Sequence, residues 1–218
     1  MRIGVIGAGN VGLGIAKRLI TKGHSVMLSF CLDAGRLPST AASLRARAGT
    51  VSEAVAFADV VVLAVPWGAV SEALSQVGDA PPRILWDCTN ALKPDLSGLA
   101  IGTVTSGGEE VAKLAPWATV VKAIPPFAQM LHSPNMLIGD KRTDVFVCGD
   151  DENARTVVAR LVREIDAQPI DAGPLSLARY AEPAAMLLVQ LAYSRKWGPR
   201  IGMSVLRGDP AHGPLDGV

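Results

Sequence analysis

Short apolar runs alternate with amphipathic stretches along most of the chain. The first run, residues 2–6, has the length and composition of a strand buried on both faces. Behind a glycine-rich stretch, apolar residues recur at helical spacing until Gly23, and residues 25–30 form a second strand-like run. These segments predict a βαβ unit of about thirty residues.

The same alternation continues through residue 171. It predicts strands at residues 60–65, 84–87, 119–123, 144–148 and 169–171, and helices at residues 39–47, 51–58, 67–77, 107–114 and 152–165. Strands that alternate with helices form a parallel sheet with right-handed crossovers. The fold class predicted is α/β, a Rossmann-type doubly wound parallel sheet with a small C-terminal helical domain.

The C-terminal part has a different character. Residues 177–197 form one long helical stretch, in which Pro183 marks a helix start or a kink. Residues 186–189 are apolar at consecutive positions, so we expect this helix to need burial on more than one side, against its own sheet and against a second subunit. We predict a dinucleotide-binding domain at 1–174, a small helical domain at 175–207 and a loose tail at 208–218.

Composition narrows the class of protein. With 49% hydrophobic residues and a net charge of +1, the 218-residue chain can bury a sizeable core and carries no basic footprint for nucleic acid or membrane. Its three cysteines are far apart, which is typical of reduced thiols and not of a disulfide framework or a metal site. No run is long enough to span a membrane, and we expect a cytoplasmic protein.

The glycine loop Gly7-Ala8-Gly9-Asn10-Val11-Gly12 stands between the first strand and the first helix. In this context Gly7 allows a tight turn, Gly9 lets the backbone approach a pyrophosphate, and Gly12 lets helix and strand pack closely. The helix N-terminus then offers free N–H groups to the phosphates. This pattern predicts an NAD(P)-binding protein.

The end of the second strand bears on the choice between NAD and NADP. An acidic residue usually binds the ribose there in NAD-dependent proteins, but none occurs before Asp33. Arg36 and Ser29 are the candidates to bind a 2′-phosphate, although Arg36 is equally well explained as a solvated loop residue. The sequence favours NADP and leaves NAD open.

Ligands of open α/β sheets lie beyond the carboxyl ends of the strands. The candidates in those positions are Pro66, Trp67, Thr89, Asn90, Ile124, Pro125, Pro126, Phe127 and His132. The first two would wall the cofactor, or else begin and pack a helix. Thr89 and Asn90 would bond the nicotinamide side or a substrate, or else form an ordinary turn. His132 is the one plausible catalytic histidine, with a surface-loop role as the alternative.

Acid–base groups are scarce among these candidates. Reduction of a carbonyl requires a positioned proton donor, and Lys122 is the only lysine near the expected site. Hydride transfer between a nicotinamide and a flavin-like ring mainly requires two rings held face to face. The segment from Ile124 to Phe127 would suffice for such a pocket, and this favours an oxidoreductase with a flavin-like acceptor.

Several stretches together resemble one family, the NADP-dependent oxidoreductases that use the deazaflavin coenzyme F-420. They are residues 7–12, 65–67, 121–126, 147–151, 164–166 and 171–175. The resemblance implies a homodimer that transfers hydride between NADPH and the deazaflavin in a cleft between a Rossmann domain and a small helical domain. It also implies that Gly7, Gly9, Asn10, Val11 and Gly12 hold the pyrophosphate, that Pro66 and Trp67 lie beside the cofactor, and that Ile124 and Pro125 face the two rings.

The chain departs from that family in two places. Where its members carry Ser and then Arg to select NADP, this chain has Phe30 and Cys31. The loop at residues 87–91 is more similar to relatives with an unknown acceptor, and to the domain that supplies electrons to membrane ferric reductases.

Two alternative functions stay open: a reductase of a small imine or hydroxy acid, with Lys122, His132 or Tyr180 as proton donor, and a non-catalytic dinucleotide sensor. The pocket that residues Ile124 to Phe127 would form for the ring of an acceptor favours an enzyme over a sensor.

Overall fold

The computed structural model describes residues 1–31 and 33–208. Its sheet contains β1 (Arg2–Ile6), β2 (Ser25–Ser29), β3 (Arg47–Ala48), β4 (Val60–Leu63), β5 (Arg83–Asp87), β6 (Ala118–Lys122), β7 (Asp144–Cys148) and β8 (Gln168–Gly173). In the described residues these eight strands are ordered β3-β2-β1-β4-β5-β6-β7-β8. Successive strands are therefore added on one side of β1 up to β3 and on its other side from β4 onward. Doubly wound proteins bind their ligands at this switch between β1 and β4.

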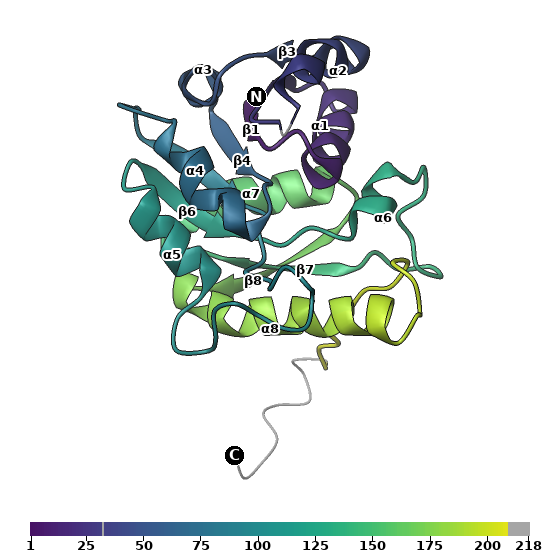
Figure 1. Ribbon diagram of the computed structural model, residues 1–218. Coiled ribbons are helices and arrows are strands. Elements are labelled where there is room, and N and C mark those ends of the chain that lie inside the picture. The colour runs from purple at the N-terminus through teal and green to yellow at the C-terminus, as the bar shows by residue number, and fades with distance from the viewer. Residues whose placement is uncertain (32, 209–218) are drawn as a thin grey trace.

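Helices cover both faces of this sheet (Figure 1). They are α1 (Asn10–Thr21), α2 (Leu37–Leu44), α3 (Val51–Phe57), α4 (Val70–Ser75), α5 (Gly107–Leu114), α6 (Ala128–His132), α7 (Glu152–Glu164) and α8 (Ala178–Val189). One core cluster contains Ile15 and Leu161, from α1 and α7. The other contains Val55, Val70 and Val111, from α3, α4 and α5. The doubly wound architecture predicted from the sequence is confirmed.

The prediction of a wholly parallel sheet is wrong at one place. β7 runs antiparallel to β6, and Lys122 pairs with Cys148. Residues 123–143 between these strands contain the short α6 in place of a full crossover helix. A parallel return must carry the chain back to the opposite ends of the strands, usually through a helix that spans the sheet, and the five-residue α6 is too short for this. The chain here re-enters the sheet at the carboxyl ends of the preceding strands, where it left, and β7 therefore runs in the opposite direction.

Several predicted boundaries also change. The helix predicted at 39–47 ends at Leu44, where Arg45 adopts the left-handed conformation with φ of 58°, and residues 47–48 form β3. The helix predicted at 67–77 is a 3-10 turn, Trp67–Ala69, followed by α4. Because their apolar spacing resembles that of a single helix, periodicity alone does not reveal such breaks.

The predicted C-terminal helix is α8, followed by a π-helical turn at Gln190–Ser194, with Pro183 inside α8. It packs against α5 and lies on the side of the molecule opposite α2 (Figure 1). Its buried residues Ala178, Glu182 and Met186 recur every four positions. On another side Leu187 is 61% exposed, so the single chain buries this helix on one side only.

Candidate cofactor and hydride-transfer site

The carboxyl ends of the central strands lie in one row. Ile6 of β1 pairs with Leu63 of β4, which pairs with Asp87 of β5, and Asp87 pairs with Lys122 of β6. Each of these residues is the last of its strand. The loops that follow therefore begin side by side at the switch point. This alignment brings together predicted site residues as distant in sequence as Asn10 and His132, which are 122 positions apart.

The glycine loop has the geometry that a dinucleotide requires. Gly7 has φ of +112°, and its N–H donates to the carbonyl of Ser29 at 2.9 Å. A Cβ on Gly12 would lie 2.0 Å from the carbonyl oxygen of Gly7, whereas a Cβ on Gly9 would meet nothing within 4 Å. Gly12 is thus needed for packing, and Gly9 leaves open space above the backbone.

That open space lies at the start of α1. Gly9 is the N-cap of this helix, makes no side-chain cap, and no acidic residue occupies the first turn. The first N–H groups of a helix have no partner within it, and they carry the positive end of the helix dipole. Gly9 and Asn10 are exposed. The helix therefore presents uncapped donors to solvent where a pyrophosphate would bind.

Residues at the end of β2 separate into a buried and an exposed group. The Ser29 hydroxyl is fully buried and donates to the carbonyl of Val5 at 2.9 Å. The hydroxyl therefore has no access to a phosphate, and the prediction that Ser29 binds the 2′-phosphate is wrong. Phe30 adopts φ of 53°. Arg36 is exposed and is the last residue of the 3-10 turn Ala34–Arg36.

The next loop holds Pro66 and Trp67 beyond β4. Pro66 is exposed and precedes the 3-10 turn that begins at Trp67. Trp67 is half-buried and packs against the core cluster beneath α4. Trp67 therefore contributes to packing, and Pro66 is exposed beyond the end of β4.

Beyond β5 and β6 the structure places a cluster of buried charges. Lys122 is completely buried, with its Nζ 2.6 Å from Oδ2 of Asp87 and 3.2 Å from Oε1 of Glu182. Burial alone would lower the pKa of Lys122, but the two carboxylates outweigh it and raise that pKa above its usual value. Lys122 is neither a strand-end surface charge nor an accessible proton donor. Sequence reasoning missed Glu182, whose signal was a lone acid in an apolar helix.

The segment after β6 returns toward the glycine loop. Ile124 and Pro125 are half-buried, Pro126 is buried, and the ring of Phe127 meets Tyr193 edge to face at 5.9 Å between centroids. The short helix α6 ends at His132. This segment therefore begins at the end of β6 and is bordered by the π-helical turn that follows α8.

His132 lies at the glycine loop. Its Nε2 is 2.8 Å from the carbonyl oxygen of Asn10, and because a carbonyl only accepts, Nε2 donates. Arg18 of α1 holds this region by donating to the carbonyls of Leu131 and Ser133. Its guanidinium also pairs with Asp166 at 2.7 Å. Arg18 was missed by sequence reasoning, because an amphipathic helix normally carries arginine on its exposed face.

Comparison with known proteins identifies the family. Residues 2–91 match the family described as NADP oxidoreductase coenzyme F420-dependent. The chain is 31% identical to the F420-dependent NADP reductase of Methanothermobacter thermautotrophicus over 209 residues, which cover 88% of this chain and 89% of the relative. The chain belongs to the family of F420-dependent NADP reductases. It is thus placed among the NAD(P)-dependent oxidoreductases, as its glycine loop predicted.

Two further proteins are similar. The rat metalloreductase STEAP3 is 27% identical over 191 residues, which make up 86% of this chain and 37% of STEAP3. The chain therefore spans little more than a third of that relative. A crystal structure of an Arthrobacter protein, described as a candidate F420-dependent NADP-reductase, is 26% identical with a TM-score of 0.83, and covers 95% of this chain and 100% of its own.

The late motifs that carried the resemblance have structural roles in this family member. Oδ1 of Asp150 accepts the N–H of Leu175 at 2.9 Å, and Oδ1 of Asp151 caps α7 by accepting the N–H of Ala154 at 2.7 Å. The carbonyl of Gly173 accepts from the N–H of Gly149. The two motifs thus fasten β7, α7 and β8 together at one turn, away from the glycine loop.

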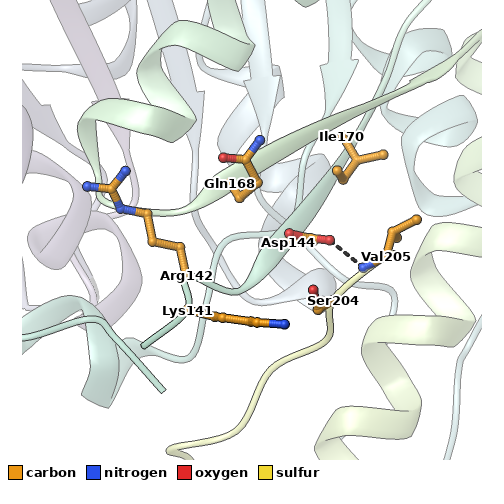
Figure 2. A pocket seen from close by; sticks show the side chains of 7 residues that line it. All are labelled: Lys141, Arg142, Asp144, Gln168, Ile170, Ser204 and Val205. Carbon is orange, nitrogen blue, oxygen red and sulfur yellow. Dashed lines mark hydrogen bonds between the residues drawn. The ribbon is translucent and has the colours of Figure 1, made fainter. Parts of the chain in front are cut away.

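One cavity in the described residues lies apart from the strand row. It has a volume of about 390 Å³, and its lining residues are Lys141, Arg142, Asp144, Gln168, Ile170, Ser204 and Val205 (Figure 2). It opens between the first residues of β7 and β8 and the C-terminal segment, where Asp144 accepts the N–H of Val205. None of the predicted site residues lines it. Among the described residues, no helix has the length and apolarity needed to cross a bilayer.

Proposed function

We propose that this protein transfers hydride between NADP(H) and a deazaflavin of the F420 type. The observation that carries the proposal is the uncapped N-terminus of α1 above Gly9, located at the switch point of the sheet. Family membership and the apolar segment from Ile124 to Pro126 at the same edge support it. When bound, the dinucleotide supplies or accepts the hydride.

The residues present fit the dinucleotide. Gly7, Gly9, Asn10, Val11 and Gly12 would hold the pyrophosphate through backbone N–H groups and the positive end of the α1 dipole. The adenine half would then extend toward β2. The nicotinamide half would extend toward β4 and β5, where Pro66, Trp67, Thr89 and Asn90 follow the strands.

Arg36 is our candidate for selecting NADP. It is the exposed basic residue of the turn after β2, and Phe30 and Cys31 offer no charge to a 2′-phosphate. We expect Arg36→Ala to raise the KM for NADPH roughly tenfold, the size of a lost charge-assisted hydrogen bond. The KM for NADH should stay unchanged. Arg163→Ala on the exposed side of α7 is the matched control, and equal effects on both dinucleotides would contradict the assignment.

The acceptor would stack against the segment after β6, with Ile124 and Pro125 facing the two rings and Pro126 and Phe127 behind them. Hydride transfer between such rings needs orientation more than a strong acid. The carbonyl- and imine-reducing alternatives need a proton donor. Lys122 is buried in ion pairs, and Tyr180 is 67% exposed on α8. His132 is the remaining donor near the glycine loop, and it is the residue that an imine or hydroxy-acid reductase would use.

We further propose a cytoplasmic homodimer, with residues 1–174 as the dinucleotide-binding domain and residues 175–207 as the small C-terminal helical domain. The apolar side chains Leu187 and Trp197 are 61% and 64% exposed, and a second subunit that covers them would satisfy the burial that this helical segment lacks. Sedimentation of the wild type and of Leu187→Glu measures the assembly. A monomeric wild type at micromolar concentration would contradict it.

The first assay follows NADPH and NADH oxidation by stopped flow with F420, FMN and ferric chelates as acceptors. Rapid F420 reduction with NADPH is the expected result. Preference for FMN or ferric chelate would favour the activity suggested by the similarity to STEAP3. Dinucleotide binding without turnover on any acceptor would refute the proposed reaction and favour the sensor or an unidentified small substrate.

A further inference from the structure

The buried charge cluster connects three separate parts of the chain. Lys122 of β6 forms ion pairs with Asp87 of β5 and with Glu182 of α8, and its Nζ donates to the carbonyl of Thr89 at 2.8 Å. All four residues are buried. Three charged groups without solvent are costly unless they are paired and hydrogen-bonded. Removing any one member would leave an uncompensated buried charge, so the three side chains hold one another in a fixed arrangement.

Glu182 makes α8 part of this geometry. Its two carboxylate oxygens accept the N–H groups of Gly107 and Gly108, the first residues of α5, at 2.8 and 2.9 Å. Oε1 also faces Lys122. The carboxylate thus joins the positive end of the α5 dipole to the lysine. Through it, the position of α8 is transmitted to the end of the strand row.

The cluster also holds the backbone on both sides of Thr89. Oδ1 of Asp87 accepts the N–H and the hydroxyl of Thr89, at 2.8 and 2.7 Å, and Lys122 holds the Thr89 carbonyl. The carbonyl of Asn90 in turn accepts the N–H of Leu92 at 2.7 Å. Asn90 is therefore placed by charges that it does not touch.

The side-chain amide of Asn90 is not fully hydrogen-bonded. The residue as a whole is partly exposed, unlike Ser29, but its Oδ1 is buried and has no hydrogen-bond partner in the part of the chain that the structure describes. A buried acceptor without a donor costs free energy and calls for an explanation such as a ligand. Asn90 follows β5 on the side of the switch point where the nicotinamide half would lie. The carboxamide of a nicotinamide ring carries the N–H donor that this oxygen lacks.

We propose that Oδ1 of Asn90 accepts the nicotinamide carboxamide N–H, and that Glu182, Lys122 and Asp87 position Asn90 for it. The inference rests on the proposed binding of a nicotinamide dinucleotide. It does not depend on the identity of the acceptor. Asn90 is then a binding residue, whereas Glu182 is a positioning residue that acts from α8 through Lys122 and Thr89.

A dinucleotide analogue tests the direct contact. The 3-acetylpyridine analogue of NADP+ replaces the carboxamide amino group by a methyl group and so lacks the donor. By calorimetry, Asn90→Ala should bind NADP+ roughly three- to tenfold more weakly, as expected for one neutral hydrogen bond. Its affinity for the analogue should be unchanged, and Asn153→Ala on exposed α7 should alter neither. Equal weakening for both dinucleotides, or none for NADP+, would overturn the assignment.

The positioning role is tested by combining variants. Glu182→Gln should weaken NADP+ binding selectively over the analogue. Added to Asn90→Ala, it should weaken binding no further, because both changes remove the same contact. Glu110→Gln, on α5 outside the cluster, is the control. Full additivity, or equal effects on both dinucleotides, would show that Glu182 has a purely structural role.

Two measures keep the test decisive. If Glu182→Gln does not fold, Thr89→Val removes the hydroxyl that donates to Asp87 and accepts from Lys122 Nζ at 3.4 Å, and leaves all three charges in place. The same selectivity and non-additivity are expected of it. All readouts are binding constants of NADP+ and its analogue. A protein that binds both dinucleotides but fails to reduce F420 would therefore refute the proposed reaction and leave the Asn90 contact to be judged by its own result.

Discussion

Alanine at Gly12 should damage folding, whereas alanine at Gly9 should damage dinucleotide binding alone. A Cβ on Gly12 would lie 2.0 Å from the Gly7 carbonyl oxygen, and Gly7 is tied to β2 by its own N–H. Helix α1 must then move by about an ångström away from β1. Overpacking of this kind costs about 3 kcal/mol, which lowers the Tm by roughly 6–12 °C in a chain of this size.

The Gly9 backbone has φ of −88°, and its Cβ position is open. Alanine there gains about 0.4–1 kcal/mol by restricting the unfolded chain and loses a similar amount as a poorer N-cap. The Tm should therefore stay within about 3 °C of wild type. The added methyl group occupies the space where the pyrophosphate would approach, and NADP+ binding should weaken at least tenfold, about 1.4 kcal/mol.

Thermal unfolding followed by circular dichroism and NADP+ titration by calorimetry measure the two effects separately. Gly102→Ala is the control, because its Cβ position is equally open and lies outside the glycine loop. A Gly9→Ala protein that binds NADP+ like the wild type would refute the assigned approach of the pyrophosphate. A Gly12→Ala protein as stable as the wild type would refute the packing argument.

Two further predictions concern acid stability and thiol reactivity. Hydrogen bonds from Arg179 hold the pKa of Glu109 below its usual value near 4.5. This ion pair stabilises the folded protein by at most about 1 kcal/mol, because it is partly exposed. The stabilisation is present at pH 7 and disappears as the pH falls through the lowered pKa. Thermal melts should thus show a gap between wild type and Glu109→Gln that closes toward pH 3; a gap that persists there would contradict it. Burial raises the pKa of Cys148 to about 12 and that of Cys88 well above its usual value. A disulfide reagent at pH 8 should therefore label Cys31 rapidly in the folded protein and the other two only after denaturation, and rapid labelling of two thiols would argue against the buried positions.

The glycine loop and Lys122 show what the local sequence can and cannot predict about a residue's role. Gly7, Gly9 and Gly12 were assigned three different roles from their spacing, and the positive φ at Gly7 and the close approach at Gly12 confirm two of them. The role of Lys122 was not deducible in this way. Its partners Asp87 and Glu182 lie 35 and 60 positions away, separations of whole βαβ units, and nothing in the local sequence distinguishes a buried lysine from a surface one.

The sequence by itself determined the alternation of strands and helices, the doubly wound class and the dinucleotide loop. These follow from interactions within a few residues, namely the period of apolar side chains, helix capping and the backbone freedom of glycine. Only the tertiary structure decided the antiparallel direction of β7, the burial of the Ser29 hydroxyl, the contact of His132 with Asn10 and the cluster around Lys122. Each of these depends on which distant segments the folded sheet brings into contact, and no local pattern records that choice.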